Sequence, residues 1–187
     1  MGTVVLFIAF VSPLCALSSA LFSARVVHHI LLVAVAAPLL GTALPRSRAG
    51  PIGFLLVLSG AVLWLWHIPT LYDAALSHIG IYWVMQISLL GTAVAFWHAV
   101  LGARTAPMTA ILATLGAFML MGLLGALLTF APAPLYAAHI IAPHAWGLTP
   151  LADQQLGGLI MWVPAGVPYA LLIARSARTL WRRAEAI

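Results

Sequence analysis

The sequence has 187 residues, of which 64% are hydrophobic and only 6% carry a formal charge. About a quarter of the residues in a soluble domain are charged, so this composition excludes an ordinary soluble fold. The net charge of +5 comes from arginines that mostly flank apolar runs, a pattern typical of membrane topology and not of nucleic-acid binding. We therefore expect a lipid bilayer around the chain and no nucleic-acid partner.

Six apolar runs are long enough to cross a membrane. They cover residues 2–21, 25–44, 52–69, 80–101, 107–130 and 155–175. Proline, glycine and arginine gather in the breaks between them, most clearly at 45–51 and 131–154. The start of the first run has no Lys or Arg, so we expect a retained helix and not a signal peptide. The sequence predicts an all-α, polytopic bundle of about six transmembrane helices, forming a single domain over residues 1–187.

The arginines set the expected orientation of this bundle. All but Arg25 follow the second, fourth or sixth run: Arg46, Arg48, Arg104, Arg175, Arg178, Arg182 and Arg183. These three regions lie on the same side of a six-span topology, and arginine-rich loops stay in the cytoplasm. Both termini are therefore predicted to be cytoplasmic.

Metal-binding side chains gather on the predicted outer side. His98 is near the inner face, whereas the other histidines fall in outer halves of runs or in outer loops: His28, His29, His67, His78, His139 and His144. Ionisable groups at membrane depth are costly and usually functional. Imidazole nitrogen combined with thioether sulfur suits copper, especially Cu(I). The predicted ligands are His29, His67, His28, Met85 and Met161.

Each candidate ligand also has a structural explanation. His28 and His29 point about 100° apart on a helix, so one of them at most is expected to face a shared site. His67 follows Trp64 and Trp66, which are typical of a membrane interface, where the histidine would act as a cap. Histidines in loops are commonly solvated.

Three further polar residues are predicted to support the ligands. Asp73 would either cap a short helix over residues 74–78 or serve the site. Asp153 and Gln154 open the last apolar run just before the glycine pair Gly157-Gly158. Asp153 would either cap that helix beside a close helix contact or orient a ligating imidazole.

Four segments, in this order, carry a resemblance to a known family. The first two are Ser12-Pro13-Leu14 and the run from His29 to Leu40. The third runs from Leu65 to Leu76 and contains Trp-His-Ile-Pro, and the fourth runs from Trp146 to Trp162 and contains Asp-Gln-Gln-Leu-Gly-Gly. Together they resemble the CtaG-type cytochrome c oxidase assembly factors over nearly the whole chain.

This resemblance implies a non-enzymatic role in maturing the haem-copper oxidase, with copper supply as the usual proposal. It implies a multi-pass protein of the bacterial inner (plasma) membrane. The expected partners are cytochrome c oxidase subunits and a periplasmic copper carrier. A homodimer is one way for so small a bundle to complete a site.

The sequence departs from the family pattern at two places. Members commonly carry His-Met-x-x-His where this chain has Arg25 to His29, so Arg25 replaces the first histidine. Either His28 substitutes for it, or the copper site is altered or lost. A Glu-His pair of the fourth span corresponds here to Met85-Gln86, in which the methionine remains a possible soft ligand.

Three other functions stay open at this point. His29 and His67 on neighbouring spans would permit a haem-binding electron carrier, although a second deep histidine pair is missing from the sequence. A second alternative is an assembly scaffold for the oxidase that binds no metal. A small permease would need a polar site at the midplane, where almost nothing is ionisable.

Overall fold

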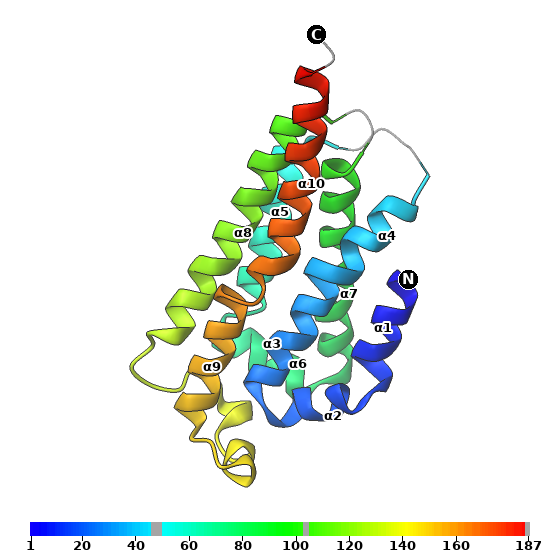
Figure 1. Cartoon of the computed structure of the whole chain (residues 1–187). Coiled ribbons are helices and arrows are strands. Elements are labelled where there is room, and N and C mark those ends of the chain that lie inside the picture. Colours follow the sequence, from blue (N-terminus) through cyan, green and yellow to red (C-terminus); the bar gives the residue numbers. More distant parts are fainter. Residues whose placement is uncertain (46–49, 103–104, 186–187) are drawn as a thin grey trace.

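The computed structural model describes residues 1–45, 50–102 and 105–185. Within these ranges the chain is a bundle of helices without β-strands, which confirms the predicted fold class (Figure 1). Arg46, Arg48 and Arg104, on which part of the predicted orientation rests, lie outside the described residues.

The described helices follow the first five predicted runs within a few residues, with additional breaks, and the sixth run extends beyond its predicted bounds, from Pro150 to Ala184. The α-helices are α1 (Gly2–Val11), α2 (Pro13–Ala20), α3 (Phe22–Ile30), α4 (Ala37–Ala43), α5 (Ile52–Leu65), α6 (Pro69–Ser77), α7 (Ile79–Val100), α8 (Pro107–Thr129), α9 (Pro150–Trp162) and α10 (Gly166–Ala184). A π-helical segment, η1 (Leu31–Ala36), joins α3 to α4, and two 3-10 helices, η2 (Ala137–His139) and η3 (Ala142–Trp146), lie between α8 and α9.

Four described segments are long and apolar enough to cross a membrane on their own: Phe22–Ala43, Ile79–Val100, Pro107–Thr129 and Pro150–Arg182. Two bent pairs raise the number to six if each counts as one span, with bends of 54° between α1 and α2 and 72° between α5 and α6. Both second helices begin with a proline, Pro13 and Pro69, which lacks the N–H that would continue the preceding helix. The predicted run 52–69 therefore turns at Trp66–Ile68 and continues as α6.

The segment from α3 to α4 runs parallel to α7. At one end the Arg25 guanidinium lies over the Tyr82 ring, 5.4 Å from its centroid. At the other end Nδ1 of His98 donates to the Gly41 carbonyl oxygen at 2.8 Å. Each contact joins two residues that are 57 apart in sequence, so the two segments run side by side in one register. His28 and His29 lie one turn after Arg25. They are therefore level with the turn that follows Tyr82 on α7.

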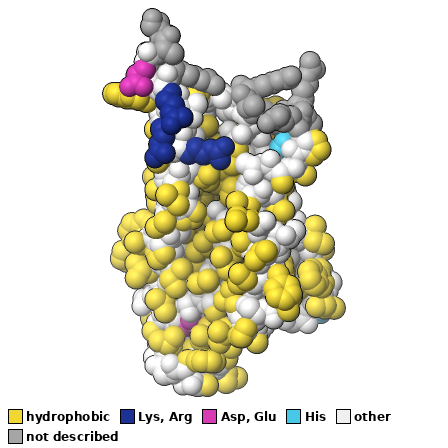
Figure 2. Space-filling model, turned by 45° about the vertical axis from the view of Figure 1, so that its right-hand side comes forward, with side chains coloured by type: hydrophobic (Ala, Val, Ile, Leu, Met, Phe, Trp, Pro, Cys, Tyr) yellow, Lys and Arg dark blue, Asp and Glu magenta, His cyan; other side chains and the backbone are white. Residues whose placement is uncertain are grey.

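The two ends of the bundle differ in chemistry. The exposed arginines Arg175, Arg178 and Arg182 belong to α10, at the upper end of the bundle, where Figure 2 shows dark-blue Lys and Arg side chains on the surface. The starts of α3 and α7, together with α6, η2 and η3, lie at the opposite end (Figure 1), which we call the histidine end because it holds His29, His67 and His139. This separation agrees with the depth predicted for the donor atoms. Which end faces the cytoplasm stays a prediction.

Candidate metal site

His29 and His67 meet inside the histidine end. Helix α3 presents His29, and the turn between α5 and α6 presents His67. Their ring centroids are 5.8 Å apart, with ring planes at 78°, and the side chains are 1% and 5% exposed. Metal–imidazole bonds of about 2.0 Å would place an ion roughly 3 Å from each ring centre. The separation is therefore compatible with one ion between the two rings.

A backbone hydrogen bond fixes the protonation of His67. Its Nδ1 lies 2.7 Å from the carbonyl oxygen of Leu63, and because a carbonyl only accepts, Nδ1 must carry the proton. Nε2 then holds the free electron pair, and it has no hydrogen-bond partner in the described part of the chain. This is the arrangement by which proteins present histidine as a metal ligand.

His28 lies on the other side of His29. Its ring meets Phe10 of α1 edge to face at 5.0 Å, and its centroid is 5.8 Å from that of His29. The structure therefore places His29 next to His67 and His28 next to α1. His28 is a neighbour of the pair, and its role as a ligand stays a prediction.

The pair belongs to a larger group of buried side chains. Polar atoms of Arg25, His28, His29, His67 and Gln86 lack hydrogen-bond partners among the described residues. More than nine-tenths of buried polar groups in proteins are satisfied, so each exception requires an explanation. The five residues with unpaired atoms lie on one stretch of α3, on the facing turn of α7 and in the turn before α6. We call them the unpaired cluster.

The two predicted methionine ligands are buried at different helix contacts. Met85 of α7 is completely buried and lies level with the histidines of α3 through the parallel register described above. Met161 of α9 packs against Gly125 of α8. Met85 thus lies level with the pair along α7, and Met161 lies one turn after Gly157, which approaches Ser23 at the start of α3.

Asp153 holds the start of α3. Its carboxylate accepts from the backbone N–H of Phe22 at 2.6 Å, from the backbone N–H of Ser23 at 3.2 Å and from the Ser23 hydroxyl. The N-cap of α9 is Thr149, so the prediction that Asp153 caps its own helix is wrong. Asp153 instead caps α3 from a distant part of the sequence, and thereby sets where the histidines of α3 stand.

Gln154 and Asp73 fasten the segment between α8 and α9. The Gln154 side-chain oxygen accepts from the N–H of Leu135 at 2.7 Å. The Asp73 carboxylate accepts from the N–H groups of Ala137 and Ala138, both at 3.1 Å. Asp73 lies within α6, which starts at Pro69, so the predicted cap of a helix over 74–78 is wrong. Its carboxylate caps η2 instead.

His139 is a buried residue whose role the sequence did not reveal. Its Nδ1 donates to the carbonyl oxygen of Ala20 at 3.1 Å, and its Nε2 accepts from the Tyr72 hydroxyl at 2.7 Å. Burial lowers the pKa of this histidine, which favours the neutral ring that these two bonds require. With both ring nitrogens occupied, His139 ties the end of α2 to α6. His78 and His144, in contrast, are exposed.

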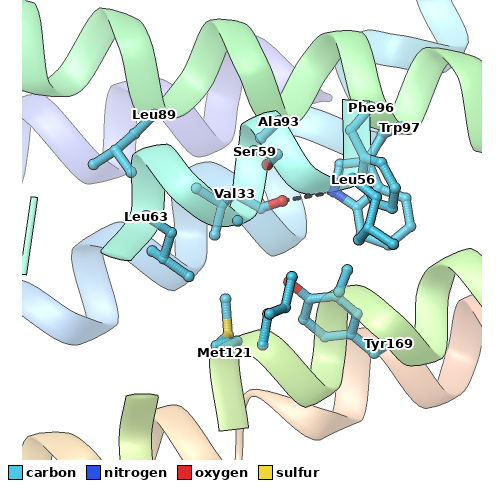
Figure 3. Close-up of a pocket in the computed structure, with 13 residues that line it drawn as sticks. Val33, Leu56, Ser59, Leu63, Leu89, Ala93, Phe96, Trp97, Met121 and Tyr169 are labelled. Carbon is cyan, nitrogen blue, oxygen red and sulfur yellow. Dashed lines mark hydrogen bonds between the residues drawn. The ribbon is translucent and has the colours of Figure 1, made fainter. Parts of the chain in front are cut away.

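The described residues contain no group of three or more His, Cys, Asp or Glu side chains arranged to hold a metal. A four-ligand zinc site of the structural type is therefore not built here. Figure 3 shows a cavity of about 30 Å³ lined mainly by apolar side chains, among them Leu63, Trp97 and Met121. It lies deeper in the bundle than the pair and has room for one or two waters.

The sequence model of the cytochrome c oxidase caa3 assembly factor family (Caa3_CtaG) matches residues 1–183. No curated protein and no solved structure gives a significant match. The match includes the helices that carry the histidine pair, the Asp153 contact and the arginines of α10, and it leaves out residues 184–187. The chain therefore belongs to the cytochrome c oxidase caa3 assembly factor family.

Proposed function

We propose that this oxidase assembly factor acts as a copper-binding protein and not as an enzyme, with His29 and His67 holding Cu(I) for delivery to the oxidase. The observation that carries the proposal is the pairing of two buried imidazoles, in which both ring nitrogens of His29 and Nε2 of His67 lack partners within the described protein. Met85, which is completely buried on α7, is the third ligand in this proposal.

The donor chemistry favours Cu(I) over the common alternatives. Two imidazoles without a carboxylate ligand suit a soft ion and do not suit magnesium or calcium, which take oxygen ligands. Cu(I) accepts low coordination numbers, whereas structural zinc takes four protein ligands. Weak binding by few ligands is also what a protein needs if it must give the ion away. In this proposal the protein receives Cu(I) from a periplasmic carrier and passes it to the oxidase.

The first test removes one ligand from the pair. His67→Ala should weaken Cu(I) binding by at least about tenfold, the loss that changes around a metal ligand typically cause. Affinity is measured on the full chain purified in mild detergent, by competition with a coloured Cu(I) chelator. In cells carrying the same variant, the copper content of the purified oxidase should fall.

The matched control is His144→Ala, because His144 is exposed on η3. It should leave both the Cu(I) affinity and the copper content of the oxidase unchanged. An oxidase with normal copper content in the His67→Ala strain would contradict copper delivery and favour a scaffold role. A Soret band in the purified protein would instead favour haem binding.

A further inference from the structure

The last helix carries a row of exposed arginines at the upper end of the bundle. Arg175, Arg178 and Arg182 follow one another at intervals of three and four residues, which places them on one face of α10. The one acid of the sequence near them is Glu185, whose carboxylate accepts from Nε1 of Trp181 at 2.6 Å. None of the three arginines forms an ion pair within the described part of the chain. Their charges are therefore left to solvent or to an anionic partner outside the chain.

An apolar groove runs between α10 and the segment of η1 and α4, and it ends at Arg175. The cavity has a volume of about 220 Å³, and Thr42 and Arg175 are the polar residues of its described lining. Because α4 and α10 both run upward in Figure 1, these two residues lie at the upper end of the groove, whereas Ala34 and Pro168 lie at its lower end. Pro168 and Arg175 are seven positions apart, a rise of roughly 10 Å along α10. The groove is therefore an apolar recess with an arginine at its upper end.

Two further surface cavities border Arg175. One of about 400 Å³ follows α10 and is lined by all three arginines. The other, of about 210 Å³, lies between α10 and the residues at the end of α7 and the start of α8, where Ser176 and Thr105 add hydroxyl groups. Among the described residues, Arg175 alone borders all three cavities, and Figure 2 shows Lys and Arg side chains beside hydrophobic surface at this end. We call the apolar groove together with Arg175 and Arg178 the arginine groove.

We propose that the arginine groove binds an anionic phospholipid, with its phosphate at Arg175 and one acyl chain along the apolar recess toward Pro168. Arginine presents a fork of N–H groups that matches two phosphate oxygens, and basic pockets between membrane helices suit anionic headgroups. A lipid fits better than an acidic protein segment, because the recess continues from the arginines into the membrane-spanning part of α10, where an acyl chain is at home and a charged peptide is not. The bound lipid joins α10 to α4. This inference is independent of copper binding.

The test compares phosphatidylglycerol with phosphatidylcholine of the same chain length, which keeps the phosphate but has no net charge. Binding of each lipid to the full chain in mild detergent is titrated by native mass spectrometry. We expect phosphatidylglycerol to bind at least about fivefold more tightly, the factor that one basic residue contributes near an anionic headgroup. Equal affinity for the two lipids would overturn the proposal and leave the arginines to an acidic surface of another protein.

Inorganic phosphate distinguishes a lipid site from a site for the free ion. Phosphate and chloride, compared at equal ionic strength, should affect the binding of phosphatidylglycerol alike, because phosphate lacks the chain that fills the apolar recess. Displacement of the lipid by phosphate and not by chloride would overturn the lipid as the occupant.

Two variants separate a defined site from a general attraction between α10 and anionic lipid. Arg175→Gln and Arg182→Gln each remove one charge from the same helix, but Arg182 borders the cavity along α10 and not the apolar groove. Arg175→Gln should lower the affinity for phosphatidylglycerol about fivefold, the contribution of one basic residue, and Arg182→Gln should lower it clearly less. Equal losses would mean that the lipid responds to the total charge of α10, and would overturn the site.

Leu171→Trp tests the recess without changing the charge. Leu171 is 67% exposed and borders both the apolar groove and the cavity lined by the arginines, so the larger ring should obstruct the acyl chain and lower the affinity for phosphatidylglycerol severalfold. Leu127→Trp is the control, because Leu127 is 54% exposed on α8 near the opposite end of the bundle. It should bind the lipid as the wild type does. Wild-type affinity in Leu171→Trp would show that the acyl chain does not use the groove, and the proposal would be wrong.

Discussion

Replacing Asp153 with alanine should lower the free energy of unfolding by about 3 kcal/mol, which combines the loss of a helix cap with two buried N–H groups left unpaired. The carboxylate is completely buried and accepts from Phe22 and Ser23, whose N–H groups begin α3. In a chain of this size the change corresponds to a drop of roughly 10 °C in melting temperature. The melting temperature is measured in detergent by light scattering or intrinsic fluorescence.

The control for this prediction is Thr149→Ala, which removes the local cap of α9. The Thr149 hydroxyl accepts from Ala152 at 3.1 Å on an exposed part of the chain, so the loss should be about 1 kcal/mol or less. Asp153→Asn should fall between the two variants, because its amide retains one acceptor oxygen. If Asp153→Ala and Thr149→Ala melt at the same temperature, the contact between α9 and α3 does not support the fold as described.

The fold was largely predictable because membrane helices leave a strong signal in sequence. Long apolar runs and the breaks between them locate α7 and α8 almost to the residue. The bends at Pro13 and Pro69 were not predicted, since hydropathy averaged over a run is the same for a straight helix and a broken one. Their prolines were visible, but a proline in an apolar run is compatible with a kink, a break or a first turn.

The candidate site was predictable in composition and less so in geometry. Depth alone gathered His29 and His67 at one end, and the structure brings their rings together. Spacing along separate helices does not fix distances between them, so the helix contacts at which Met85 and Met161 are buried could not be foreseen. The burial of His139 was missed because it follows from a partner, Tyr72, on a distant helix.

The aspartate at the start of α9 shows the limit of motif reasoning most clearly. An acid near a helix start is consistent with a cap, and Asp153 is indeed a cap, but of a helix 130 residues away in sequence. Such a contact leaves no local pattern. The glycine pair that follows was correctly associated with close helix packing. In the structure Gly157 lies against the start of α3, and Gly158 lies against α8.

Gly158→Ala should be the most damaging single methyl group that can be added to this bundle. A Cβ at Gly158 would lie 2.5 Å from Oγ1 of Thr129 and 2.6 Å from both the Thr129 nitrogen and the Gly125 carbonyl oxygen. Two of these three atoms are backbone and cannot rotate away, so α8 and α9 must separate. We expect a loss of about 3 kcal/mol, at the upper end of the range for overpacking, measured as a lower melting temperature and less folded protein.

Gly91→Ala is the matched control, since it adds the same methyl group to the middle of α7, where nothing lies within 4 Å of the new Cβ. There the substitution should be neutral or stabilise the helix by about 0.5–1 kcal/mol, because alanine loses less conformational freedom on folding than glycine. The sign of the effect should therefore differ between two chemically identical changes. Equal effects would mean that helix propensity, and not the α8–α9 contact, decides the stability of this bundle. A loss confined to Gly158→Ala would show that the close approach of α8 and α9, the helix that carries Asp153, supports the fold.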